Sequence, residues 1–198
     1  MKIPTTLALN LLLTLLITAC GTSVNTPDIS HNPDPKMGYE ITLTIKDAPG
    51  SFDSIDAAAL YDVANNECSP FDKFIGIHRH PPTQDIHLPV IPMSDHEYTA
   101  TAYLDLLKDE DYYDLGVCHW TMDRVIFRLK AGNAEFVASI LRNNIISQQP
   151  ATIYLLKQAY VDRATDSRPG NSTLLNDVVK RHPELFFPVT IVARESFQ

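Results

Sequence analysis

Four histidines in the middle of the chain are the first residues whose types and spacing could do chemistry. His78 and His80 are one residue apart, which in an extended loop directs both imidazoles to the same side. His87 and His96 follow closely enough to complete a zinc site. The cation of Arg79 lies between the first two histidines, however, and Pro81-Pro82 is typical of an ordinary rigid loop. The chain also has no His-Glu helix motif and no closely spaced cysteine pair. The sequence therefore favours a rigid loop without bound metal, with a zinc site as the alternative.

An acidic stretch with two tyrosines, KDEDYYD at Lys108–Asp114, is the second candidate. It lacks the Asp-x-Asp-x-Asp-Gly loop with a distal Glu that binds calcium. Paired carboxylates for glycoside hydrolysis require a spatial separation that spacing along the chain does not give. Two interpretations stay open: a solvated hairpin loop, or a docking loop whose carboxylates steer a basic partner and whose tyrosines supply rigid contact area. On the second interpretation the contacts are Asp109, Glu110, Asp111, Tyr112, Tyr113 and Asp114, with His78 and His80 beside them.

Signatures of nucleophilic and phosphate chemistry are absent from the sequence. The chain contains no Gly-x-Ser-x-Gly elbow. With only seven glycines, no phosphate-cradling loop can be assembled. The sequence therefore predicts a protein with no catalysis of its own and no cofactor.

The first 20 residues, MKIPTTLALNLLLTLLITAC, indicate export. Lys2 gives a positive start, and the apolar run Leu7–Ile17 has the length of a signal peptide but is too short for a membrane span. Small residues then lead directly to Cys20. The segment resembles a bacterial lipoprotein signal with its lipobox. That resemblance implies cleavage before Cys20, diacylglycerol on its sulfur and an acyl chain such as palmitate on its new amine. An uncleaved helical anchor with a coincidental cysteine is the alternative.

The same resemblance implies a location. Lipoproteins kept in the inner membrane tend to carry Asp directly after the acylated cysteine, and this chain carries Gly21. It is therefore expected at the periplasmic face of the outer membrane, held there by lipid. The expected organisation is a cleaved signal peptide at 1–19, a lipidated N-terminus and flexible tether at 20–37, and a single domain at 38–198. The tether is rich in Ser, Thr, Asn, Asp and Pro, as linkers are.

The two remaining cysteines are predicted to form a disulfide. Setting aside the lipidated Cys20 leaves Cys68 and Cys118 in a compartment that permits disulfides. Closing a loop of about 50 residues would stabilise the fold by roughly 4 kcal/mol in the chain-entropy model. Two free buried thiols are the alternative, and the wide separation disfavours metal binding.

The segments that must position these residues are mostly predicted to be strands. Tyr39–Lys46 is the clearest, because apolar and polar residues alternate strictly along it. Ile55–Val63 is ambiguous between helix and strand, and its short length favours a strand. Asp85–Met93 also alternates, but its two prolines confine it to a sheet edge. Further strands are predicted at Glu97–Leu107, within Leu115–Leu129, and at Glu135–Leu141, Thr152–Val161 and Phe186–Ala193, with a helix at Ser172–His182.

Seven to nine short strands with one C-terminal helix predict a mainly β protein with an antiparallel β-sandwich. Gly116, Cys118 and Trp120 would share one face of an extended segment, so the indole could pack beside the disulfide as in immunoglobulin-like cores. The Cys…Trp…Cys order of true immunoglobulin domains is absent, so the expectation concerns the architecture alone.

The charge narrows the class of partner. The chain has 198 residues and a formal net charge of −8. This length suits one domain with a real core. The acidic excess disfavours nucleic acid and anionic membrane surfaces as partners and favours a basic protein.

Together these features predict a lipid-anchored periplasmic module that binds another protein. Its general plan resembles immunity or inhibitor lipoproteins, which neutralise envelope-attacking toxins such as lipases, muramidases or amidases. One alternative is a structural accessory lipoprotein of an envelope secretion complex, for example of type VI. The other is a metal-binding or hydrolytic periplasmic protein.

Overall fold

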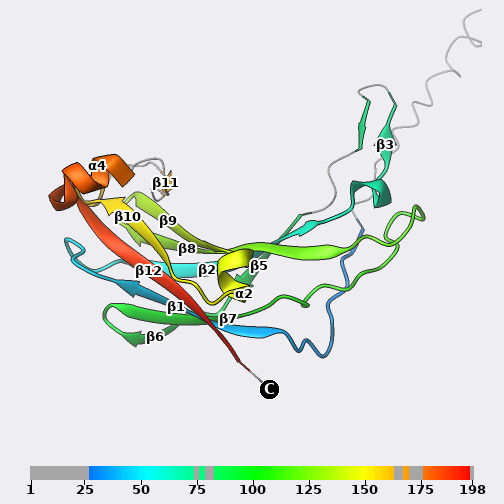
Figure 1. Ribbon diagram of the computed structural model, residues 1–198, viewed down its shortest axis with the longest axis horizontal. Helices are drawn as coiled ribbons and strands as arrows, with labels where there is room; N and C mark the ends of the chain where they lie inside the picture. Colours follow the sequence, from blue (N-terminus) through cyan, green and yellow to red (C-terminus); the bar gives the residue numbers. More distant parts are fainter. Residues whose placement is uncertain (1–26, 74–75, 79–82, 163–166, 170–175, 197–198) are drawn as a thin grey trace, which may run out of the picture.

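A computed structural model describes residues 27–73, 76–78, 83–162, 167–169 and 176–196. Two five-stranded sheets pack face to face as a β-sandwich (Figure 1). The first has the order β10 (Ala151–Leu156), β12 (Phe186–Glu195), β1 (Gly38–Ile45), β7 (Glu97–Tyr103) and β6 (Ile91–Ser94). The second has the order β11 (Ser167–Pro169), β9 (Ala134–Leu141), β8 (Trp120–Ala131), β2 (Ser54–Val63) and β5 (Gln84–Leu88). The predicted mainly β, antiparallel sandwich is confirmed; only the short β11 pairs in parallel among the described strands.

Short elements complete the described chain. A two-stranded ribbon, β3 (Phe71–Asp72) and β4 (Ile77–His78), projects from one end of the sandwich (Figure 1). The helices are η1 (Asn66–Cys68), α2 (Arg142–Ile146), α3 (Lys157–Asp162), α4 (Asn176–Arg181) and η3 (Pro183–Leu185). None of the helices in the described ranges has the length and apolar character needed to cross a membrane.

The alternation predicted for the first strand is confirmed in β1. Tyr39, Ile41, Leu43 and Ile45 are buried between the sheets, while the intervening side chains face outward. β1 lies between β12 and β7, so its apolar face is extended by buried residues on both neighbours. The ambiguous segment that became β2 is a strand because it pairs along its whole length with β8 and, over its centre, with β5.

The proline-containing segment predicted as an edge strand forms two edge strands in different sheets. β5 pairs with β2 in the second sheet, and β6 pairs with β7 in the first. Pro89 and Val90 lie between them and carry the chain from one sheet to the other. Pro92 lies in β6 itself, where an edge position tolerates its missing N–H.

Four aromatic rings in the core join the two sheets near the starts of β9 and β12. Phe136 on β9 and Phe187 on β12 lie edge to face, with ring centroids 6.0 Å apart. Phe52 contacts both rings, and Tyr160 on α3 stacks on Phe136 at 6.5 Å. The Tyr160 hydroxyl donates a hydrogen bond to the carbonyl of Ser51 at 2.5 Å, so its polar end is satisfied.

Several predicted boundaries differ from the structure. The segment predicted as a strand at Thr152–Val161 leaves the sheet after Leu156 and becomes α3, because Ala159 and Tyr160 are buried against the core from a helix. The strand predicted to reach Leu107 ends at Tyr103. α2 lies between the two segments predicted as strands at Glu135–Leu141 and Thr152–Val161, where no helix was predicted. α4 falls within the predicted C-terminal helix, whose residues 172–175 lie outside the described ranges.

The buried Tyr61 on β2 is expected to make the fold less stable at alkaline pH. Its hydroxyl donates to the carbonyl of Tyr103 on β7 at 2.6 Å and so links the two sheets. Burial, with a smaller contribution from the charge of Asp105, raises the pKa of Tyr61 well above its usual value of 10. The unfolded chain therefore loses this proton first, and the stabilisation that is complete below pH 10 declines as the pH rises above it. We expect urea midpoints to fall above pH 10 and to fall less steeply in Tyr61→Phe; equal slopes would contradict this.

Candidate functional site

One end of the sandwich continues into a loop structure that is closed by a disulfide (Figure 1). We define this structure as the tip, residues 65–71 and 108–120. Cys68 and Cys118 are bonded, with their Cα atoms 5.2 Å apart, so the predicted disulfide is confirmed. The bond connects the chain that follows β2 to the chain that precedes β8. The disulfide therefore holds together two halves of the tip that are far apart in the sequence.

The apolar support of the tip is small. Val63 and the two cysteines form a buried cluster separate from the main core. Tyr112, Tyr113 and Trp120 pack against this cluster, and Trp120 also contacts the main core. The predicted packing of the indole beside the disulfide is thus confirmed, although it occurs in a satellite cluster at the end of the sandwich.

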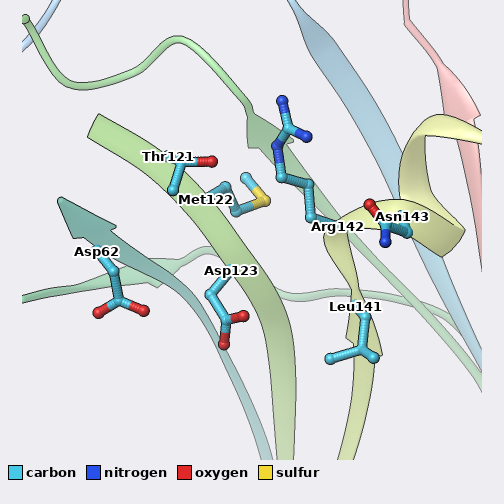
Figure 2. A pocket seen from close by; sticks show the side chains of 7 residues that line it. All are labelled: Asp62, Thr121, Met122, Asp123, Leu141, Arg142 and Asn143. Carbon is cyan, nitrogen blue, oxygen red and sulfur yellow. The ribbon is translucent and has the colours of Figure 1, made fainter. Parts of the chain in front are cut away.

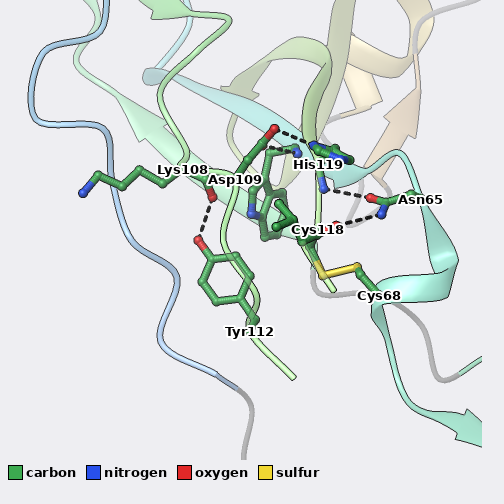
Figure 3. Close-up of polar contacts among 9 residues, drawn as sticks. Asn65, Cys68, Lys108, Asp109, Tyr112, Cys118 and His119 are labelled. Carbon is green, nitrogen blue, oxygen red and sulfur yellow. Dashed lines mark hydrogen bonds and ion pairs between the residues drawn. A yellow bond between two sulfur atoms is a disulfide. The ribbon is translucent and has the colours of Figure 1, made fainter. Parts of the chain in front are cut away.

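Asn65 and Asp109 hold the segment before β8 from its two sides (Figure 3). The Asn65 amide donates to the carbonyl of Val117 and accepts from the N–H of His119, both at 2.8 Å. One carboxylate oxygen of Asp109 accepts from the N–H of Trp120 at 2.8 Å, and the other lies 2.7 Å from His119 Nδ1. These bonds fix the backbone at the point where the loop becomes a strand.

Two further carboxylates shape the loop from within. Asp111 accepts from the N–H groups of Leu115 at 3.0 Å and Gly116 at 3.1 Å. Gly116 has a φ of +110°, a conformation that glycine adopts at low cost. Glu110 accepts a hydrogen bond from the hydroxyl of Ser30 at 2.9 Å. The carboxylates that were predicted to meet a partner therefore first hold the loop in one conformation.

The predicted aromatic contacts are partly used inside the tip. The Tyr112 hydroxyl donates to the carbonyl of Lys108 at 2.7 Å, and its ring lies edge-on to Trp120 with centroids 6.4 Å apart. Burial raises the pKa of both Tyr112 and Tyr113. Asp114 is exposed at a turn with a φ of +57°. The tyrosines thus support the loop, and its outer surface is made by other residues.

Sequence reasoning missed the apolar residues on that outer surface. Leu115 is 53% exposed and Val117 is 44% exposed, between the acidic residues and the disulfide. Phe71, on the other half of the tip, is also exposed. The sequence analysis placed Gly116, Cys118 and Trp120 on one face of an extended segment but assigned no role to the alternate residues Leu115 and Val117. In the structure residues 115–119 form a loop in which Cys118 faces inward and its neighbours face outward.

The remaining predicted site residues lie away from the tip or outside the part of the chain that the structure describes. His78 belongs to β4, but its side chain lies outside the described part of the structure, as do His80 and the lipidation candidate Cys20. His87 is on β5 in one sheet, whereas His96 is between β6 and β7 in the other. Among the described residues, no group of three or more His, Cys, Asp or Glu side chains could hold a metal ion.

An open recess of about 270 Å³ lies beside the ends of β2, β8 and β9 (Figure 2). Asp62 and Asp123 line one side of it, and the guanidinium of Arg142 lies on the other, with buried Met122 between them. Asp123 is already paired with Arg124 at 2.5 Å. No carboxylate among the described lining residues is hydrogen-bonded to a hydroxyl or imidazole, so the recess offers mixed charge without an acid–base pair.

Comparison of the chain with models of protein families, with curated proteins and with solved structures finds no match.

Proposed function

We propose that the chain is a lipid-anchored protein of the periplasmic face of the outer membrane, which binds another protein through the tip and carries out no catalysis. Its best-supported role is that of an immunity or inhibitor protein against an envelope-attacking toxin or hydrolase. The observation that carries this proposal is the exposure of Leu115 and Val117 on a loop held by a disulfide and by its own carboxylates.

The physical support comes from preorganisation. A loop that is already ordered loses little conformational entropy when it binds, so more of the contact energy appears as affinity. Exposed apolar side chains that share a loop with charged residues are the kinds of residue from which protein interfaces are built, with an apolar centre and a polar rim. Exposed carboxylates at Asp109, Asp111 and Asp114 lie in the same loop as the apolar pair, and they would steer a basic partner toward it.

A capture experiment with a matched control tests this proposal. The bait is the mature chain with Cys20→Ser, and envelope extracts are the source of partners. Leu115→Ser/Val117→Ser removes the apolar pair of the tip. Ile91→Ser/Met93→Ser removes a second pair with the same spacing, 58% and 62% exposed, on β6.

We expect the tip variant to bind a captured partner at least about tenfold more weakly, because each central contact contributes on the order of 1 kcal/mol or more. The control variant should bind as the wild type does, and added salt should slow association. Equal binding by the two variants would contradict the proposal. Capture of a secretion-complex component would instead favour the structural accessory role.

A further inference from the structure

The described chain begins beside the tip and is bound to it (Figure 1). Residues 30–37 run antiparallel to residues 104–108: the N–H of Asn32 donates to the carbonyl of Leu106 at 2.7 Å, and the N–H of Lys108 donates to the carbonyl of Ser30 at 3.0 Å. At the other end of this pairing, the N–H of Leu104 donates to the carbonyl of Met37 at 3.0 Å. The second half of the predicted tether is therefore attached to the body.

Side chains fix both ends of the attached segment. The carboxylate of Asp105 accepts from the N–H groups of Lys36 at 2.9 Å and Met37 at 3.0 Å. At the other end, the Ser30 hydroxyl donates to Glu110 of the tip. The point from which the chain runs on toward Cys20 is consequently fixed at the tip and lies far from the opposite end of the sandwich.

Covalent geometry then limits how far the tip can lie from the lipid. Ser30 follows Cys20 by ten positions in the sequence, and a chain of this length spans at most about 35 Å in any conformation. The 12 residues of β8 run from the tip toward the opposite end over about 40 Å. If Cys20 is lipidated, the tip is the end that is kept close to the membrane.

We propose that the tip faces the membrane and that its partner is a protein with a basic surface held at that membrane. This inference rests on the proposed lipid anchor and on the proposed use of the tip. Lipid itself is a poorer occupant, because the loop that carries Leu115 and Val117 also carries the exposed carboxylates of Asp109, Asp111 and Asp114, and anionic headgroups would repel them. A basic protein surface complements the same charges.

The single tryptophan of the chain allows a direct test of orientation, because Trp120 lies in the tip. The lipidated full chain is placed in phosphatidylethanolamine–phosphatidylglycerol vesicles that contain dansyl-labelled lipid, and energy transfer from tryptophan is measured. Trp120→Phe/Leu185→Trp moves the donor to η3 at the opposite end, where residue 185 is 46% exposed. We expect transfer to be several-fold stronger from position 120.

The outcomes separate the inference from the proposed function. Equal or stronger transfer from position 185 would overturn the orientation while leaving the anchor and the binding tip intact. Transfer that is absent from both positions, and unchanged by Cys20→Ser, would overturn the anchor itself. Quenching of Trp120 by bromine-labelled phospholipid in the same vesicles would show that the tip enters lipid. It would overturn the proposal that the tip binds a protein.

The class of partner is tested by photo-crosslinking in intact envelopes, with a benzophenone amino acid at position 115 or, as a control, at position 185. An adduct at 115 with a protein that sediments with membranes of cells lacking this chain supports the proposal. Adducts with a protein that remains soluble in such cells, with phospholipid, or equally from both positions would overturn it.

Discussion

Phe136→Ala is expected to lower the free energy of unfolding by about 3–5 kcal/mol, the usual cost of removing a fully buried phenylalanine ring. The ring is buried on β9 and contacts Phe52, Tyr160 and Phe187, which lie on other parts of the chain. These rings connect the second sheet to β12 of the first sheet and to α3. Alanine would leave a cavity there that neighbouring strands cannot close without moving. Urea unfolding followed by far-UV circular dichroism measures the loss.

Val137→Ala is the matched control, because the next residue on β9 faces outward and is only partly buried. It should change the free energy of unfolding by about 1 kcal/mol or less. Phe136 lies in the main core and Trp120 in the tip, so binding through the tip should survive Phe136→Ala at temperatures where the variant is folded. A loss below about 1.5 kcal/mol would show that the two sheets do not depend on this aromatic cluster.

The sandwich could be predicted because its signal is local. Tyr39, Ile41, Leu43 and Ile45 alternate with polar residues, and a period of two is a property of one strand that does not depend on its neighbours. The disulfide was predictable for a related reason: once one cysteine of three is assigned to lipid, one pairing remains. Sheet order was not predictable, because it depends on which edges meet, and β5 and β6 separate into different sheets within two residues.

The outer surface of the tip could not be predicted because its contacts are distant in sequence. Ser30 and Glu110 are 80 residues apart, and Asn65 is more than 50 residues from its partners Val117 and His119. Bonds of this kind fix the backbone at Val117 and His119, and the sequence pattern alone does not reveal them. The acidic stretch was correctly identified as a loop, but its carboxylates act first on the backbone of the tip.

Removal of the disulfide by Cys68→Ala/Cys118→Ala is expected to lower the free energy of unfolding by about 2–4 kcal/mol. The chain-entropy model gives about 4 kcal/mol for a closed loop of this size, and the cysteines are separated by 50 residues. Alanine is the suitable replacement because both sites are buried, so a serine hydroxyl would lack water. Urea unfolding gives the loss, and the wild type in dithiothreitol should show the same loss.

The same variant separates the tip from the sandwich. The satellite cluster of Val63 and the two cysteines is small, whereas the main core does not include either cysteine. The tip should therefore open first: Trp120 emission should shift to the red and amide exchange should accelerate in residues 108–120, while the protection of β1 and β12 persists. Because a loosened tip must be ordered again on binding, affinity for the captured partner should fall as well. If Trp120 emission and the affinity for the partner are both unchanged in this variant, the internal hydrogen bonds of the tip are enough to keep it ordered. The disulfide would then stabilise the protein only by restricting the unfolded chain.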